Sequence, residues 1–143
     1  MKLPFLSAES KHTDCGLLVM RIVFGITLFI KHGYEKVTEF PRMSHEFPNL
    51  FHLGEPATLT IALVSDGICS LLLVLGFGTR YAALIGFLNI LVAWIWVHHF
   101  SFFGPRGDHG EIIVLFLGGL LGFMLTGPGK YSLDYLLFTK NKR

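Results

Sequence analysis

Three unusual side chains, charged or amide, fall inside apolar stretches of this chain of 143 residues: Arg21, Asp66 and Asn89. A charged side chain near the centre of a bilayer is costly, is usually paired and often has a function. If the stretches are antiparallel helices, a rise of about 1.5 Å per residue brings Arg21 and Asp66 to similar depths. The sequence therefore predicts a buried Arg21–Asp66 ion pair with Asn89 as its hydrogen-bonding neighbour.

A second group of side chains lies where the same stretches begin or end. His32 and Glu35 are spaced i, i+3 and share a helix face, while Trp94 and His98 close another stretch and Glu111 opens the last. A neutral imidazole exchanges protons near physiological pH, and a nearby carboxylate tunes it. These five residues form the predicted ligand-binding outer rim, which suits a quinol or another small redox ligand.

Both groups also have a structural interpretation. The buried trio either handles a proton or ligand or only fixes helix register. The rim residues either line a pocket or anchor helix ends at lipid headgroups. No metal site is predicted, because the adjacent His98 and His99 project about 100° apart on a helix. Cys15 and Cys69 form no C-x-x-C motif, which argues against thiol chemistry.

Four apolar runs must position these groups. The chain is 52% hydrophobic and only 15% charged, and a helix needs roughly 20 apolar residues to cross a bilayer. A water-soluble protein with this sequence would have no polar face left for the solvent, so the sequence predicts an integral membrane protein. The predicted helices cover residues of about 15–32, 57–77, 80–103 and 111–126.

Short turns between these runs make consecutive helices antiparallel neighbours. The predicted fold is therefore all-α, an integral membrane four-helix bundle that forms a single domain over residues 1–143, with a short cytoplasmic tail at 127–143. Between the first two helices, apolar residues recur at helical spacing in a polar connection, which predicts a segment lying in the membrane interface. The small residues of Gly118-x-x-x-Gly122 predict a packing face for a neighbouring helix.

Lys and Arg are unevenly divided between the two ends of the predicted helices. Seven fall on the side of the chain termini and four on the other side. The positive-inside bias therefore predicts that both termini are cytoplasmic. The segment His45–His52 would then face outward, and its role stays open. The formal charge of +2 is too small and dispersed to indicate a nucleic-acid partner.

Four motifs in a fixed order resemble the DoxX family of small bacterial membrane proteins. They are MRIVFG at 20–25, KHGYEK at 31–36, LLLVLGFGTR at 71–80 and GPGKYSLD at 127–134, with Gly110-Glu111 before the last apolar run. The likeness extends from Leu17 to Asp134. Arg21, His32 and Gly33 match the arginine and His-Gly positions of the family, and Asp66 stands where related sequences often carry Glu.

The resemblance implies a multi-pass protein of the bacterial cytoplasmic (inner) membrane. It further implies a small membrane subunit or accessory of a quinone-linked redox or oxidative-stress assembly, with quinone as the candidate ligand. The implied partners are the lipid bilayer, proteins of a redox complex and further copies of the chain. A membrane chaperone, a scaffold or a small-solute transporter with a buried Arg–Asp pair is the alternative. The chain shows no self-contained catalytic motif, so the sequence leaves enzymatic activity and substrate open.

Overall fold

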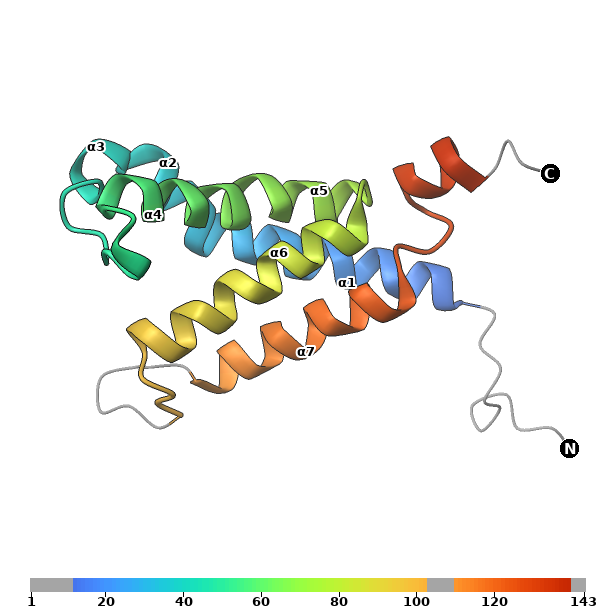
Figure 1. Ribbon diagram of the computed structural model, residues 1–143. Coiled ribbons are helices and arrows are strands. Elements are labelled where there is room, and N and C mark those ends of the chain that lie inside the picture. Colours follow the sequence, from blue (N-terminus) through green and yellow to red (C-terminus); the bar gives the residue numbers. More distant parts are fainter. Residues whose placement is uncertain (1–11, 103–109, 140–143) are drawn as a thin grey trace, which may run out of the picture.

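The computed structural model describes residues 12–102 and 110–139, and every regular element in these ranges is helical (Figure 1). The all-α prediction is confirmed. Each long helix except the last combines α-helical and π-helical pieces. In chain order the pieces are α1 (Thr13–Leu28), η2 (Phe29–Gly33) and α2 (Tyr34–Thr38), then α4 (Glu55–Leu63), η4 (Val64–Cys69) and α5 (Ser70–Leu75), then α6 (Thr79–Val92) and η5 (Ala93–Val97), and finally α7 (Gly110–Thr126).

Three of these composite helices are long and apolar enough to cross a membrane: Thr13–Thr38, Glu55–Leu75 and Thr79–Val97. Helix α7 is apolar but has only 17 residues. The third helix ends at Val97, and not near residue 103 as expected, because His99 and Phe100 adopt positive φ angles of 49° and 57°. Residues 103–109 and 140–143, which belong to the predicted third helix, loop and tail, lie outside the described residues.

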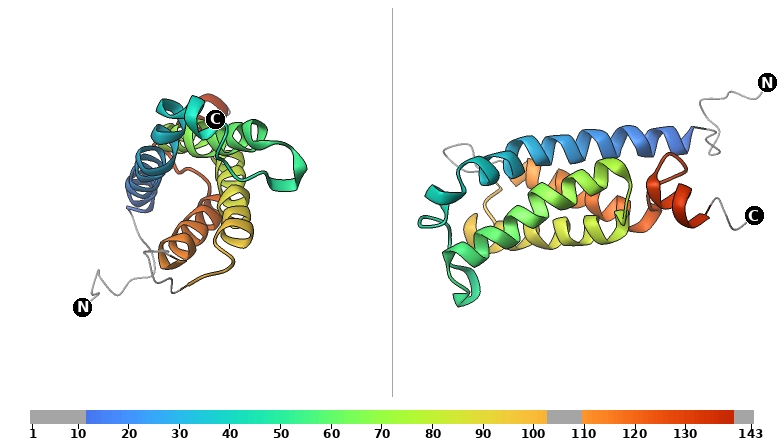
Figure 2. Two further views of the ribbon diagram at one scale, coloured as in Figure 1. Left: turned by 90° about the vertical axis from the view of Figure 1, so that its left-hand side faces the viewer. Right: turned by 90° about the horizontal axis from the view of Figure 1, so that it is seen from above.

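The first two composite helices run antiparallel, and close glycine contacts fix their register (Figure 2). A Cβ on Gly25 of α1 would lie 2.6 Å from the carbonyl oxygen of Ser70 in α5. A Cβ on Gly33 would lie 2.5 Å from the carbonyl oxygen of Asp66 in η4. Residue numbers therefore rise along one helix while they fall along the other. Only glycine lets the two backbones approach this closely.

Helices α6 and α7 enclose the main apolar core together with α5. Its fully buried members are Leu73, Ala83, Leu120 and Phe123. Because α6 carries Ala83 and Gly86 where it faces Leu120, the two helices come together over small side chains.

Helix α1 reaches α7 through the side chain of Phe24. Its ring meets the rings of Phe116 and Phe123 edge-on, at centroid distances of 5.5 and 5.8 Å, and rests on the backbone of Gly119. The prediction that Gly118 and Gly122 form a packing face within the bundle is wrong. A Cβ added at either position would meet no atom of the described residues within 4 Å.

The connection between the first two long helices lies at the distal end, which we define as the end of the bundle opposite the chain termini (Figure 1). After α2 it contains a short helix α3 (Phe40–Met43) and a 3₁₀ turn η3 (Leu50–His52). Phe51 and His52 adopt positive φ angles of 55° and 58°, and the Phe51 ring packs on Trp96 at a centroid distance of 5.2 Å. The connection thus folds back over η5.

The opposite, terminal end is held together by Arg21, which is fully buried. Its guanidinium donates to the carbonyl oxygens of Leu73 and Val74 at 3.5 and 3.4 Å, and also to that of Tyr131. The first two belong to the last turn of α5, where helix carbonyls lack partners and a cation is favourable. Gly76 ends this helix with a φ of 70°, and a Cβ there would overlap the guanidinium.

The segment around Tyr131 also fastens the start of α6 and of α1. The Asp134 carboxylate accepts hydrogen bonds from the backbone N–H groups of Gly78 and Thr79, at 2.7 and 3.0 Å. Asp14 of α1 accepts one from the N–H of Lys130 at 2.9 Å. The motif GPGKYSLD therefore joins α1, α5 and α6 at the terminal end.

The predicted Arg21–Asp66 ion pair is wrong. The prediction treated the ends of the two helices as level, but α1 begins well beyond the end of α5. The glycine contacts place Gly33, and not Arg21, beside Asp66. Because Gly33 and Arg21 are twelve residues apart in one helix, the two charges are separated by about 18 Å along the axis.

We expect Arg21→Gln to lower the free energy of unfolding by about 3 kcal/mol, because it leaves buried helix carbonyls without their charged donor. Thermal unfolding of the purified protein in detergent measures the loss. Arg80→Gln is the matched control, since Arg80 is exposed and its donation among the described residues is to the Leu125 carbonyl, at 3.4 Å. Equal stability losses in the two variants would contradict this role of Arg21.

Candidate functional site

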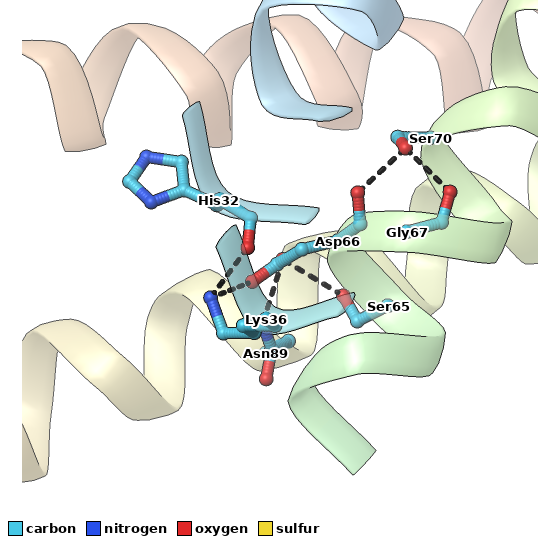
Figure 3. A network of polar contacts seen from close by, with 7 residues as sticks. All are labelled: His32, Lys36, Ser65, Asp66, Gly67, Ser70 and Asn89. Carbon is cyan, nitrogen blue, oxygen red and sulfur yellow. Dashed lines mark hydrogen bonds and ion pairs between the residues drawn. The ribbon is translucent and has the colours of Figure 1, made fainter. Parts of the chain in front are cut away.

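Asp66 forms the centre of a buried polar cluster in the distal half of the bundle (Figure 3). Its carboxylate forms an ion pair with the Lys36 ammonium at 2.9 Å and accepts a hydrogen bond from the Asn89 amide at 3.0 Å. Ser65 donates to the same carboxylate at 3.4 Å. The side chains of Lys36 and Asp66 are only 11% and 7% exposed. The predicted neighbour Asn89 is therefore confirmed as a partner of Asp66, but the cation is Lys36.

Lys36 was missed at the sequence level because it lies beyond the first apolar run. The helix continues through this position as α2, so the side chain points back into the bundle. Its ammonium also donates to the carbonyl oxygen of His32, one helical turn earlier, at 2.9 Å. The available signal was the i, i+4 spacing of His32 and Lys36, which put the lysine on the same helix face as a predicted site residue.

All three composite helices change to π-helical geometry at this level of the bundle. His32 lies in η2, Asp66 lies in η4, and His98 directly follows η5. Short π-helical turns inside α-helices are frequent at functional sites, because the extra residue redirects side chains and carbonyl groups. Two of these turns, η2 and η4, meet beside the cluster, which marks this level as the candidate site.

A cavity of about 820 Å³, the distal chamber, adjoins the cluster. Lys36, Asp66 and Asn89 form its polar end, while its walls are mainly aliphatic and aromatic side chains of α1, α4, α6 and α7. Its distal side is covered by apolar residues of the connection, among them Phe47 and Phe51. A few polar groups at one end of an apolar cavity are typical of a site for a small organic ligand.

The five rim residues separate into two groups. His32 and His98 line the distal chamber from different helices, but the ring of His32 points away from the ion pair (Figure 3). Glu35 and Glu111 are exposed and do not line the chamber. Trp94 does not line it either, because its indole donates to the Ser101 carbonyl at 3.4 Å.

Comparison with known proteins identifies the family. A profile of the DoxX family matches residues 16–99, a range that contains Arg21, His32, Lys36, Asp66 and Asn89. The chain belongs to the DoxX family. It is thus a DoxX-family membrane protein, as the sequence motifs predicted.

Similar proteins match along nearly the whole chain. An uncharacterized protein of Haemophilus influenzae is 35% identical over 133 residues, which cover 91% of this chain and 96% of the relative. The Escherichia coli protein named inner membrane protein YqjF is 34% identical over 135 residues, covering 91% and 98%. A second uncharacterized protein of H. influenzae is 32% identical, covering 85% and 83%. No solved structure matches the chain.

We expect Asp66→Asn and Lys36→Met each to lower the free energy of unfolding by about 3–5 kcal/mol, because each leaves one buried charge without its partner. The double variant should lose clearly less than the sum of the two single losses. Thermal unfolding in detergent measures all three. The exposed pair of Glu39 and Arg42, 3.0 Å apart, is the control, and its variants should change stability by less than about 1 kcal/mol. Additive losses at Lys36 and Asp66 would show that the two residues do not interact.

Proposed function

We propose that the chain is a multi-pass protein of the bacterial inner membrane, with four spans in one bundle and both termini in the cytoplasm. Three helices satisfy the length for crossing, and α7 extends over about 25 Å, so Glu111 at its start would reach the headgroup layer. The E. coli relative is named an inner membrane protein. The excess of Lys and Arg on the side of the termini, seven against four, supports the orientation.

We further propose that the distal chamber binds the head group of a quinone. This would make the chain a small membrane subunit or accessory of a quinone-linked redox or oxidative-stress assembly. The observation that carries the proposal is the apolar chamber of about 820 Å³ with Lys36, Asp66 and Asn89 at one end. When bound, a quinone supplies two-electron and two-proton chemistry.

The polar end offers the hydrogen bonds that such a head group requires. An ammonium has three N–H donors, and two of those of Lys36 go to His32 and Asp66. The third is directed to a ligand carbonyl in our proposal. The amide oxygen of Asn89 would accept a hydrogen bond from a ligand hydroxyl, since its nitrogen is committed to Asp66. Oxidised and reduced head groups therefore both find a partner.

Proton exchange would involve the two histidines of the chamber. His32 and His98 line the chamber and lie close enough to interact electrostatically. Imidazole is the side chain best suited to accept and release protons near neutral pH. In this proposal they pass protons between the head group and the aqueous phase at the distal end, while the Lys36–Asp66 pair fixes the position of the ligand.

We expect Asn89→Leu to weaken binding of a tail-less dimethoxy-methyl-benzoquinone about tenfold, equivalent to about 1.4 kcal/mol. The substitution removes a ligand contact but keeps the Lys36–Asp66 pair. Equilibrium dialysis of the detergent-purified protein measures the affinity. Thr60→Val is the control, because Thr60 is exposed on α4 and, within the described residues, its hydroxyl donates to the Pro56 carbonyl at 2.8 Å. Absence of saturable binding to the unmodified protein would refute the proposed ligand.

We expect Cys15, which is exposed at the start of α1, to resist a membrane-impermeant thiol reagent in intact cells and to react after permeabilisation. The protein for this test carries Cys69→Ala. Ser44→Cys, made in a background without both native cysteines, should react in intact cells, since Ser44 lies at the distal end. Mass shift after labelling measures both. The reverse pattern would invert the proposed orientation.

A further inference from the structure

The four long helices are unequally packed around the distal chamber. The first and second meet backbone to backbone at Gly33. The second and third are joined by the hydrogen bond between Asn89 and Asp66. The third and fourth pack along α6 and α7, with Gly86 facing Leu120 on the terminal side of the chamber. Three neighbouring pairs of helices are thus in direct contact beside the chamber.

Between α1 and α7, the described residues make no such contact beside the polar end of the chamber. Phe24 bridges the two helices at the terminal edge of the chamber, where its ring meets Phe116. Seen along the bundle axis, α1 and α7 occupy adjacent corners and no other helix lies between them (Figure 2). On the distal side of Phe24 there is thus an interval between α1 and α7, in which the two helices face each other without backbone contact.

Residues on both sides of this interval line the distal chamber. They are Thr27, Leu28 and Lys31 of the first helix and Ile112, Ile113 and Phe116 of α7. Thr27 and Lys31 are also exposed, and Ile112 is 41% exposed. Exposed lining residues also occur on α4 and α6, among them Ile61 and Leu88, but the two long helices that contain them are joined by the hydrogen bond between Asn89 and Asp66. No such contact joins the described residues of α1 and α7 here, so this is where we place the reach of the chamber to the surface. That surface belongs to two apolar helices and would face lipid.

We propose that this interval is a side opening through which the apolar tail of a membrane-soluble ligand passes between the chamber and the bilayer. The inference rests on the proposed quinone site and extends it: the ligand is an isoprenoid quinone whose head lies at Lys36 and Asn89 and whose tail leaves between Thr27 and Ile113. The ligand then enters from the membrane and not from water.

The depths of the polar end and of the side opening fit a ligand with a polar head and an apolar tail. Gly33 is level with Asp66 at the polar end, and Thr27 precedes Gly33 by six residues, which is about 9 Å along the helix. The displacement runs from the distal end towards the middle of the bundle. The head would lie near the polar surface, and the tail would be directed to the bilayer centre, where apolar chains are most stable.

We test the opening with two ligands that differ in the tail alone, decylubiquinone and its tail-less head group. Thr27→Trp should weaken binding of decylubiquinone about tenfold and leave the head group unaffected. Leu125→Trp is the control, since Leu125 is 72% exposed on α7 at the terminal end. Unchanged affinity for decylubiquinone would overturn the side opening. Failure of the tail-less head group to bind the unmodified protein would instead refute the quinone site.

A measurement without added ligand decides whether lipid reaches the opening. Trp94 and Trp96, the only two tryptophans of the chain, are replaced by Phe, and Ile113→Trp then serves as the fluorophore in brominated phospholipid. Strong quenching is expected, close to that of Leu121→Trp, which is exposed, and above that of Phe123→Trp, which is buried. Quenching as weak as at Phe123 would overturn the opening.

The tryptophan at position 113 also shows whether the apolar chain in the opening is the tail of a quinone or an acyl chain of a phospholipid. Decylubiquinone should lower the quenching at position 113 by displacing brominated acyl chains, whereas the tail-less head group should not. If decylubiquinone has no effect, the opening admits phospholipid acyl chains and the assignment to the quinone tail is wrong.

Discussion

The distal half of the bundle is organised by the need to neutralise one buried carboxylate. Asp66 lies among apolar helices with 7% of its side chain exposed, and an unpaired charge there would be strongly destabilising. Its partners come from two other helices, Lys36 from α2 and Asn89 from α6. Gly33 permits the close approach that the short distance to Lys36 requires. One charge thus determines how three helices meet.

The terminal half meets a related requirement with the opposite charge. Arg21 is buried without a carboxylate in hydrogen-bonding contact among the described residues, and its partners are carbonyl oxygens of α5 and of Tyr131. The end of α5 supplies the partial negative charge that a buried cation needs. The two ends therefore differ in kind. At the terminal end, backbone carbonyls surround the buried charge, whereas at the distal end the buried charge adjoins the distal chamber.

The sequence was sufficient for those features that depend on composition and local pattern. Apolar length predicted the helices, and the motifs around Arg21 and His32 predicted the family. The contact between Asn89 and Asp66 was also accessible, because few polar residues lie inside the apolar runs. The partner of Asp66 was not, because pairing depends on helix register, which is set by close glycine contacts between the two helices. Lys36 was overlooked because its helix extends past the apolar run that signalled it.

The π-helical turns affect how sequences of this family should be compared. A π-helical turn holds one residue more than an α-helical turn, and one residue corresponds to about 100° of rotation. Apolar positions before η4 are therefore out of phase with those after it, so a single helical wheel drawn through Glu55–Leu75 misplaces half of its side chains. A relative that lacks one residue in this stretch would present the same lipid-facing and interior surfaces with a regular helix. One-residue gaps within the apolar runs are thus structurally meaningful, and they are the gaps that an alignment of membrane helices ordinarily penalises most.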